Sequence, residues 1–171
     1  FSTRITWINN GKGWERDDDW QIPAYAVFMD GSDYAQKGVV LVDMNGDALI
    51  DVVRADASTR RSWLNNGNGW TENINWALPD HINFVEGSST LMDRNGDGVP
   101  DVVYSPTQNE ARSWINRADQ NYLLKKIVNS QGGSIDISYL PMTSVDNTGG
   151  DGKSDLSFTG WLVNEVTSDN G

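Results

Sequence analysis

Short apolar runs separated by segments rich in Asp, Asn and Gly make up most of the chain, and no segment shows a sustained helical period. The segments that read as strands are residues 39–42, 49–54 and 62–65, followed by 89–92, 99–104 and 112–115. Residues 62–65 lead into Asn66-Gly-Asn-Gly69, which is a strong turn signal. The pattern predicts short β-strands. Pro100 falls among the first residues of one strand, where a missing N–H is tolerated.

A sequence repeat underlies this pattern. Residues 4–14 recur as residues 60–70, and a third copy begins at residues 111–116 but lacks the Gly-x-Gly-Trp ending. The first three tryptophans each recur 56 residues later, so that Trp7, Trp14 and Trp20 match Trp63, Trp70 and Trp76. Two acidic segments lie only 50 residues apart. The first unit therefore carries additional residues, which we assign to a loop insertion at 28–38.

A unit of about fifty residues with three or four short strands has the size of a β-propeller blade. The chain holds the end of one blade (1–20), a complete blade (about 21–76) and most of another (about 77–120). A closed propeller needs at least about four blades, so we expect an all-β fragment of consecutive blades that is not closed.

From residue 122 the composition changes. Residues 123–129 and 134–140 read as a hairpin, residues 143–158 as a polar loop and residues 161–167 as a final strand. We therefore divide the chain into blades at 1–121 and a β-rich connector at 122–171.

The two acidic segments have oxygen-bearing side chains at positions 1, 3, 5 and 9 of a nine-residue loop. These side chains are Asp43, Asn45, Asp47 and Asp51 in the first loop, and Asp93, Asn95, Asp97 and Asp101 in the second. This pattern suits a hard cation that binds several oxygens, and the carbonyls of Leu49 and Val99 at position 7 would add a ligand each. Solvated turns are the alternative, but two copies at blade spacing favour two structural Ca²⁺ sites.

Two details qualify the calcium prediction. Ala48 stands where the motif prefers glycine, so the first loop either turns differently or binds more weakly. Neither loop has an acidic residue at position 12, which excludes an EF-hand. A third candidate loop, residues 147–155, has Gly149 at position 3 and is a weaker match.

The net charge of −11 and the pI of about 4.3 argue against nucleic acid or an anionic membrane surface as a partner. The chain contains no cysteine, and none of its apolar runs approaches the roughly 18 residues of a membrane span. It opens on Phe-Ser-Thr-Arg without a signal peptide, so we interpret it as part of a longer protein.

No catalytic set and no organic-cofactor site is predicted. The sequence lacks G-x-S-x-G, a Cys/His pair and a glycine-rich phosphate loop, and His81 is the single histidine. The acidic clusters are better explained by calcium than by a hydrolase. The eight tryptophans could form a sugar-binding platform, but their regular spacing favours a role as packing residues of the repeat. Trp161 lies outside the repeat and stays unassigned.

The acidic loops followed by Asp-Val-Val, with the Trp-Ile/Leu-Asn-Asn-Gly-x-Gly-Trp segments, resemble the FG-GAP/VCBS family of calcium-binding propeller repeats over roughly residues 1–120. Residues 123–141 and 147–171 resemble the junction after the propeller in large bacterial proteins of the SpvB/Tc-toxin B-component class, which lead into RHS/YD repeats.

The resemblance implies a non-catalytic structural and interaction module of a large secreted or surface-delivered bacterial protein, with any toxic activity elsewhere. Its partners would be the remaining blades and an RHS-like region of the parent chain, with a cell-surface protein or glycan as a further candidate.

Three alternatives stay open. One is an adhesive or glycan-binding propeller of a secreted or cell-surface protein, and another is a propeller-based lyase or hydrolase. The third is a dockerin, but the β-branched residues after each acidic loop favour strands over dockerin helices.

Overall fold

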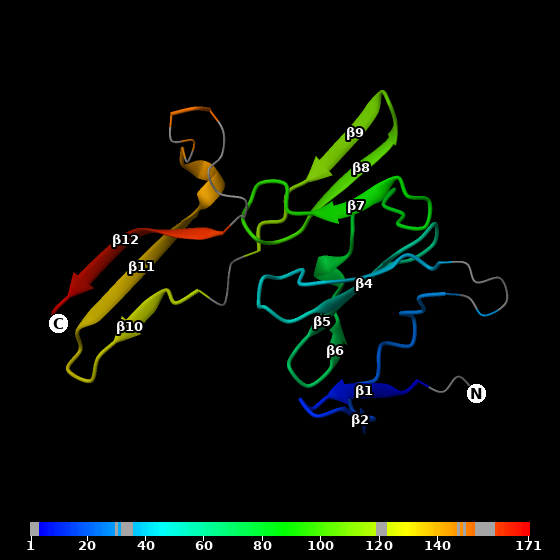
Figure 1. Ribbon diagram of the computed structural model, residues 1–171, viewed down its shortest axis with the longest axis horizontal. Helices are drawn as coiled ribbons and strands as arrows, with labels where there is room; N and C mark the ends of the chain where they lie inside the picture. Colours follow the sequence, from blue (N-terminus) through cyan, green and yellow to red (C-terminus); the bar gives the residue numbers. More distant parts are fainter. Residues whose placement is uncertain are drawn as a thin grey trace.

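The computed structural model describes residues 4–29, 31, 36–118, 123–146, 148, 150–152 and 160–171. Within these ranges every regular element is a β-strand or a short 3₁₀ turn, and all strand pairs are antiparallel. The prediction of an all-β chain is therefore confirmed. The strands form four small open sheets in the described part of the chain (Figure 1).

The central sheet is a four-stranded meander, β3-β4-β5-β6. Its strands are β3 Val39–Val42, β4 Asp51–Ala55, β5 Arg60–Asn65 and β6 Trp70–Glu72. Its strand count and order are those expected of one propeller blade. The following sheet, β7-β8-β9, repeats the first three strands with β7 Ser89–Met92, β8 Asp101–Thr107 and β9 Glu110–Trp114.

The first sheet is the hairpin of β1 Thr6–Asn9 and β2 Trp14–Asp17. It corresponds to β5 and β6, since Thr6 donates from its hydroxyl to the Trp20 carbonyl as Ser62 does to the Trp76 carbonyl. We call β1–β2 unit 1, β3–β6 unit 2 and β7–β9 unit 3.

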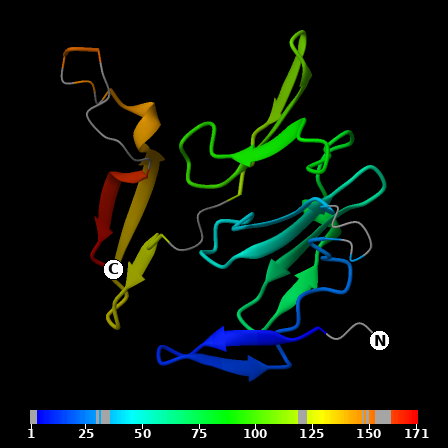
Figure 2. The same cartoon turned by 45° about the vertical axis from the view of Figure 1, so that its right-hand side comes forward.

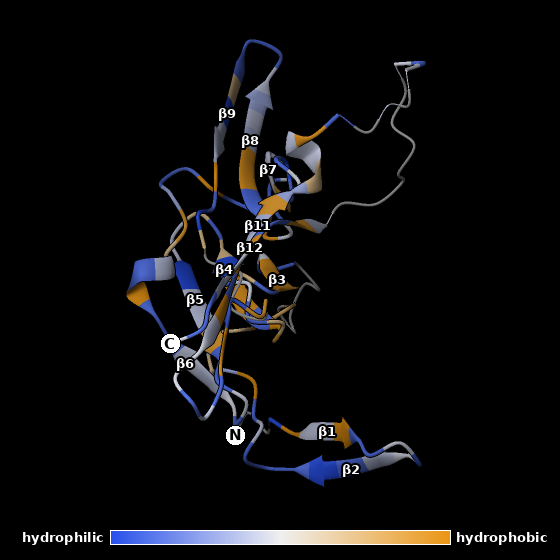
Figure 3. Cartoon of the chain, turned by 90° about the vertical axis from the view of Figure 1, so that its left-hand side faces the viewer, coloured by the Kyte–Doolittle hydropathy of each residue, from blue (hydrophilic) through white to orange (hydrophobic). Residues whose placement is uncertain are grey.

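Successive side chains of β4 point to opposite faces of its sheet, so β4 contributes to two hydrophobic clusters. One of these clusters is a core shared by units 2 and 3. Val53 and Ala55 pack with Leu78, Ile82 and Val102 between the two units. On the opposite face, Val52 packs with Ala26 and Trp63. Figure 3 shows hydrophobic residues on β3 and the lower part of β8 near the middle of the molecule, whereas the tip of the β8–β9 hairpin is hydrophilic.

Tryptophans at equivalent repeat positions differ in burial. Trp63 is buried, whereas Trp7 is 56% exposed and Trp14 is 69% exposed. The reason is that Trp63 packs on β4, and unit 1 has no counterpart of β4 among the described residues. The burial of a tryptophan at this position therefore depends on a strand equivalent to β4. This agrees with the prediction that the tryptophans are packing residues of the repeat.

The connector is a three-stranded sheet beside the repeat units (Figure 2). β11 Ser134–Pro141 pairs with β10 Lys126–Val128 on one side and with β12 Trp161–Asp169 on the other. The expected hairpin and final strand are thus present, with an irregularity in the β11–β12 pairing between Ser138 and Tyr139.

Several element boundaries differ from the sequence-based expectation. β4 begins at Asp51 and β8 at Asp101, later than expected, because each acidic loop continues to its ninth position. Pro100 consequently precedes β8 instead of lying within it. Of the insertion at 28–38, Met29 and Gln36 form a bridge and the Lys37 N–H donates to the Phe28 carbonyl, so the two ends of this segment are paired.

Candidate metal centres

Each acidic loop connects two neighbouring strands of one unit. The first follows β3 and ends where Asp51 pairs with Val42, and the second follows β7 and ends where Asp101 pairs with Met92. The structure therefore brings each predicted ligand set into a single turn. The residues are Asp43, Asn45, Asp47, Leu49 and Asp51 in one turn, and Asp93, Asn95, Asp97, Val99 and Asp101 in the other.

The two loops contain the same eight hydrogen bonds at equivalent positions. The first aspartate organises the turn: Asp43 Oδ1 accepts from the N–H groups of Gly46 and Asp47, and Oδ2 accepts from Ala48. Asp93 accepts from Gly96, Asp97 and Gly98 in the same way. The repeat in the sequence is thus a repeat in atomic detail.

The ninth residue closes each loop from inside the protein. Asp51 is fully buried, and its two carboxylate oxygens accept from Met44 N at 2.8 Å and from Asn65 N at 2.7 Å. Asp101 is equally buried and accepts from Arg94 N at 3.0 Å and Asn116 N at 2.8 Å. Each carboxylate therefore joins its own loop to the end of a neighbouring strand.

The first loop places three carboxylates near one another. Burial raises the pKa of Asp51, against the hydrogen bonds from Asn65 and Met44, and the negative charges of Asp47 and Asp43 raise it further. The three carboxylates are thus close enough to repel one another. A bound divalent cation would remove this repulsion.

The donor set fits a hard cation, because it consists of carboxylate, amide and carbonyl oxygens. Among the described residues, no group of three or more Asp, Glu, His or Cys side chains lies close enough together to hold a metal ion. The carboxylates of Asp43 and Asp93 instead accept hydrogen bonds from backbone N–H groups of their own loops. A carboxylate oxygen has further lone pairs beyond one hydrogen bond, so both roles are compatible. Calcium binding stays a prediction.

The substitution of glycine by alanine in the first loop does not change its turn. Ala48 has a φ of 68°, close to the 82° of its counterpart Gly98, and both N–H groups donate to the first aspartate of their loop. Of the two expectations for Ala48, the different turn is wrong. The first loop instead holds a residue with a Cβ atom in the left-handed region.

We expect Ala48→Gly to stabilise the protein by about 1 kcal/mol, because glycine relieves the left-handed strain. For a chain of this size, the melting temperature should rise by about 2–4 °C, measured by calorimetry. Gly98→Ala is the matched control and should lower stability by a similar amount. An unchanged melting temperature for Ala48→Gly would contradict this account of the loop.

The connector contacts the second acidic loop directly. The Trp161 indole N–H donates to the Asp97 carbonyl at 2.7 Å, and the Thr143 hydroxyl donates to the Asn95 carbonyl. A Cβ atom on Gly96 would lie 2.2 Å from Thr143 Cγ2, so a larger residue at this position would force the Thr143 side chain to move. Trp161, unassigned from the sequence, therefore positions the connector, and no local sequence signal indicates that role.

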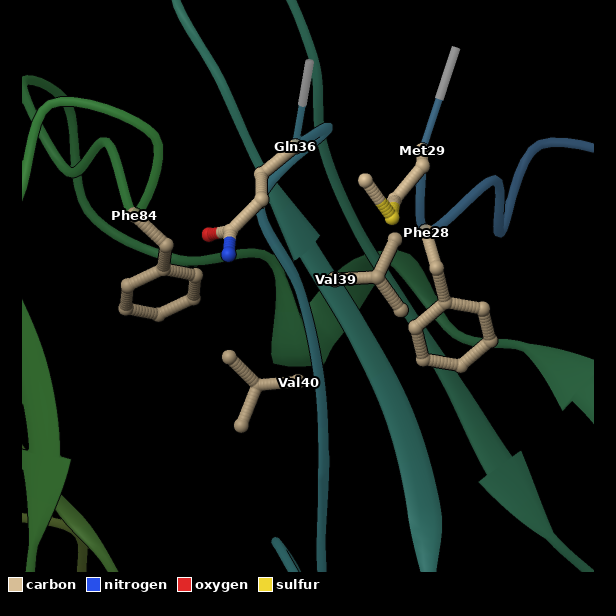
Figure 4. A pocket seen from close by; sticks show the side chains of 7 residues that line it. Phe28, Met29, Gln36, Val39, Val40 and Phe84 are labelled. Carbon is tan, nitrogen blue, oxygen red and sulfur yellow. The ribbon is translucent and has the colours of Figure 1, made fainter. Parts of the chain in front are cut away.

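Figure 4 shows a different cavity, of about 320 Å³, between the paired ends of the insertion and β3. Phe28, Val40 and Phe84 line it, and Gln36 contributes the one polar side chain drawn. None of the described residues that line it is an acid, a base or a nucleophile. Its lining residues come from the two ends of the insertion, from β3 and from Phe84.

The remaining candidates add no site. His81 is exposed and adopts a positive φ of 73°. Of the third acidic loop, Asn147, Gly149 and Asp155 lie outside the described residues. Among the described residues, the chain forms no helix of the length and apolarity needed to span a bilayer.

A family model described as the insecticide toxin TcdB middle/N-terminal region matches residues 65–171. This match covers more than half of the chain, from the end of β5 through the connector, and the chain belongs to this family. No curated protein and no solved structure matches it. The family confirms the Tc-toxin resemblance drawn from residues 123–171, while the FG-GAP/VCBS assignment stays a prediction.

Proposed function

We propose that this chain is a calcium-stabilised, non-catalytic structural and interaction module of a secreted bacterial toxin of the Tc class. Its residues 1–121 supply consecutive propeller blades of the FG-GAP/VCBS type, and residues 122–171 form the connector to the next region of the parent protein. The observation that carries this proposal is the presence of two acidic loops with the same eight hydrogen bonds, each closed by a buried aspartate.

Calcium would act on structure in two places. In each loop it would offset the repulsion among the carboxylates and hold the hairpin at its turn. The second loop also accepts hydrogen bonds from Trp161 and Thr143, so ordering it would order the attachment of the connector. This coupling supports a scaffold role, since it passes rigidity from a blade to the segment that follows.

The partners of such a module are other parts of the toxin. The remaining blades and the RHS-like region of the parent chain fit its exposed sheet edges and exposed tryptophans better than a soluble ligand does. The carboxylates of the acidic loops accept hydrogen bonds from backbone N–H groups of their own loops. These features favour a structural role over a lyase or hydrolase.

Calcium stoichiometry tests the proposal directly. Isothermal titration should show two ions per chain, bound at about 0.1–1 mM as in extracellular modules. The double variant Asp93→Asn, Asp97→Asn should bind one ion, because the second loop then loses two of its charges.

The matched control changes two exposed acids outside the loops, Asp80→Asn and Glu86→Gln, and should still bind two ions. Absence of calcium binding in the native chain, or two ions in the loop variant, would reject the metal assignment.

A further inference from the structure

Among the described residues, unit 3 has no counterpart of β6, the outer strand that completes unit 2. β6 pairs with β5 in unit 2, with Asn65 opposite Trp70 and Trp63 opposite Glu72. The counterpart of β5 is β9, which pairs with β8 on one side and with no described strand on the other (Figure 1). β9 also ends at Trp114, whereas β5 continues to Asn65, the counterpart of Asn116.

In unit 2, strand β6 contributes one large side chain, that of Trp70. The Trp70 indole N–H donates to the Ile50 carbonyl at 3.3 Å, and its ring meets the Trp20 ring edge-on with centroids 5.3 Å apart. It also packs on the cluster that contains Val52 and Trp63. Trp70 thus fills the space between the sheet and the segment that precedes it.

The same space in unit 3 is a cavity of about 270 Å³, which we call the β9 cavity. Four of its lining residues are the repeat counterparts of the residues around Trp70. Trp76 corresponds to Trp20, Pro100 to Ile50, Val102 to Val52 and Trp114 to Trp63. Asn116, which corresponds to Asn65 opposite Trp70, lines it as well. The β9 cavity has the walls of the Trp70 site without the indole.

The chain's own tryptophans do not supply that indole. The third repeat copy lacks the Gly-x-Gly-Trp ending, and the next tryptophan, Trp161, donates to the Asp97 carbonyl of the second acidic loop. The β9 cavity and the unpaired side of β9 therefore lie together without a described occupant.

We infer that the β9 cavity binds an aromatic side chain, tryptophan by preference, on an extended segment of a partner polypeptide that adds to β9 as a fourth strand. Strand addition of this kind gains affinity from main-chain hydrogen bonds and specificity from alternate side chains. The aromatic residue lies opposite Asn116, and its indole N–H donates to the Pro100 carbonyl as Trp70 does to Ile50.

Charge defines the rest of the segment. In unit 2, Glu72 follows Trp70 by two positions and pairs with Arg61 at 3.6 Å. The counterpart of Arg61 is Arg112 on β9, which pairs with Glu110 at 2.9 Å, and Arg117 lines the cavity itself. The partner segment is accordingly an aromatic residue followed two positions later by an acidic one. This inference does not depend on calcium binding.

A synthetic peptide with the sequence of residues 66–74, which includes β6, is the probe. Titrated into the isotope-labelled chain, it should shift the amide signals of Ser113 and Ile115 and the indole signals of Trp76 and Trp114. The same peptide with Trp70→Ala should bind on the order of tenfold more weakly, because a buried tryptophan dominates such contacts.

A matched pair of protein variants tests the location. Ala77 is exposed and lines the cavity, so Ala77→Trp should obstruct it and weaken peptide binding by a similar factor. Ala57→Trp, at an exposed position outside the lining, should bind as the native chain does.

Three results would overturn the inference. They are no shift on β9 at saturating peptide, equal affinity for the tryptophan and alanine peptides, or contacts showing that a residue outside the described ranges already fills the cavity.

Discussion

Removing calcium is expected to lower the melting temperature of the chain by about 10 °C. A site with a dissociation constant of about 0.1–1 mM in 10 mM calcium stabilises the folded state by about 1.4–2.7 kcal/mol, because the ion binds the folded loop alone. Two sites together give about 3–5 kcal/mol, and each kcal/mol corresponds to about 2–4 °C for a chain of this length. Calorimetry in calcium and in chelator measures the difference directly.

Two controls make the melting experiment specific. Magnesium at the same concentration should restore little of the loss, since it demands near-ideal octahedral geometry and dehydrates reluctantly. The loop variant Asp93→Asn, Asp97→Asn should show about half of the native calcium response. Identical melting temperatures in calcium and chelator would contradict both the calcium sites and the proposed stabilisation.

Asp51→Ala is expected to cost about 4 kcal/mol of unfolding free energy in chelator, and more in calcium because the first calcium site is lost as well. The Asp51 carboxylate is fully buried and accepts from Met44 N and Asn65 N. Alanine leaves both backbone donors without an acceptor, at about 1–3 kcal/mol each, and opens a small cavity as well. Urea denaturation followed by tryptophan fluorescence measures this loss.

Asp51→Asn separates the two roles of this side chain. It keeps the shape and one acceptor oxygen but loses the charge, so the loss in chelator should be smaller than for alanine while the calcium response of the first loop disappears. Asp80→Ala, at an exposed position, should change stability by less than about 0.5 kcal/mol. A loss below about 1 kcal/mol for Asp51→Ala would contradict the role of the buried carboxylate as an acceptor.

Much of the local structure was predictable because it depends on neighbouring residues. The apolar runs around the acidic segments became β3, β4, β7 and β8, and the turn at residues 66–69 joins β5 to β6. Loop positions 1, 3 and 5 act within a few residues of one another, so their spacing alone brings Asp43 and Asp47 into one turn. The connector hairpin was predictable for the same reason.

The errors arose where a distant group decides the conformation. The strands begin at Asp51 and Asp101 because those carboxylates accept from the N–H groups of Asn65, the last residue of β5, and Asn116, which follows β9. Ala48 is a different case: three donors of its own loop, its own N–H among them, converge on Asp43 and hold the left-handed turn. Local preference alone would have assigned that position otherwise.

The sequence by itself determined that this chain is all-β, that it repeats, and that its acidic loops recur in register with the tryptophans, because periodicity and turn residues act over short distances. Only the tertiary structure decided which surfaces those repeats leave unpaired. Trp161 donates a hydrogen bond to the second acidic loop, Trp7 and Trp14 lie exposed, and the β9 cavity forms where Trp70 has no counterpart among the described residues. These features depend on how the sheets pack against one another, because that packing decides which side chains are buried.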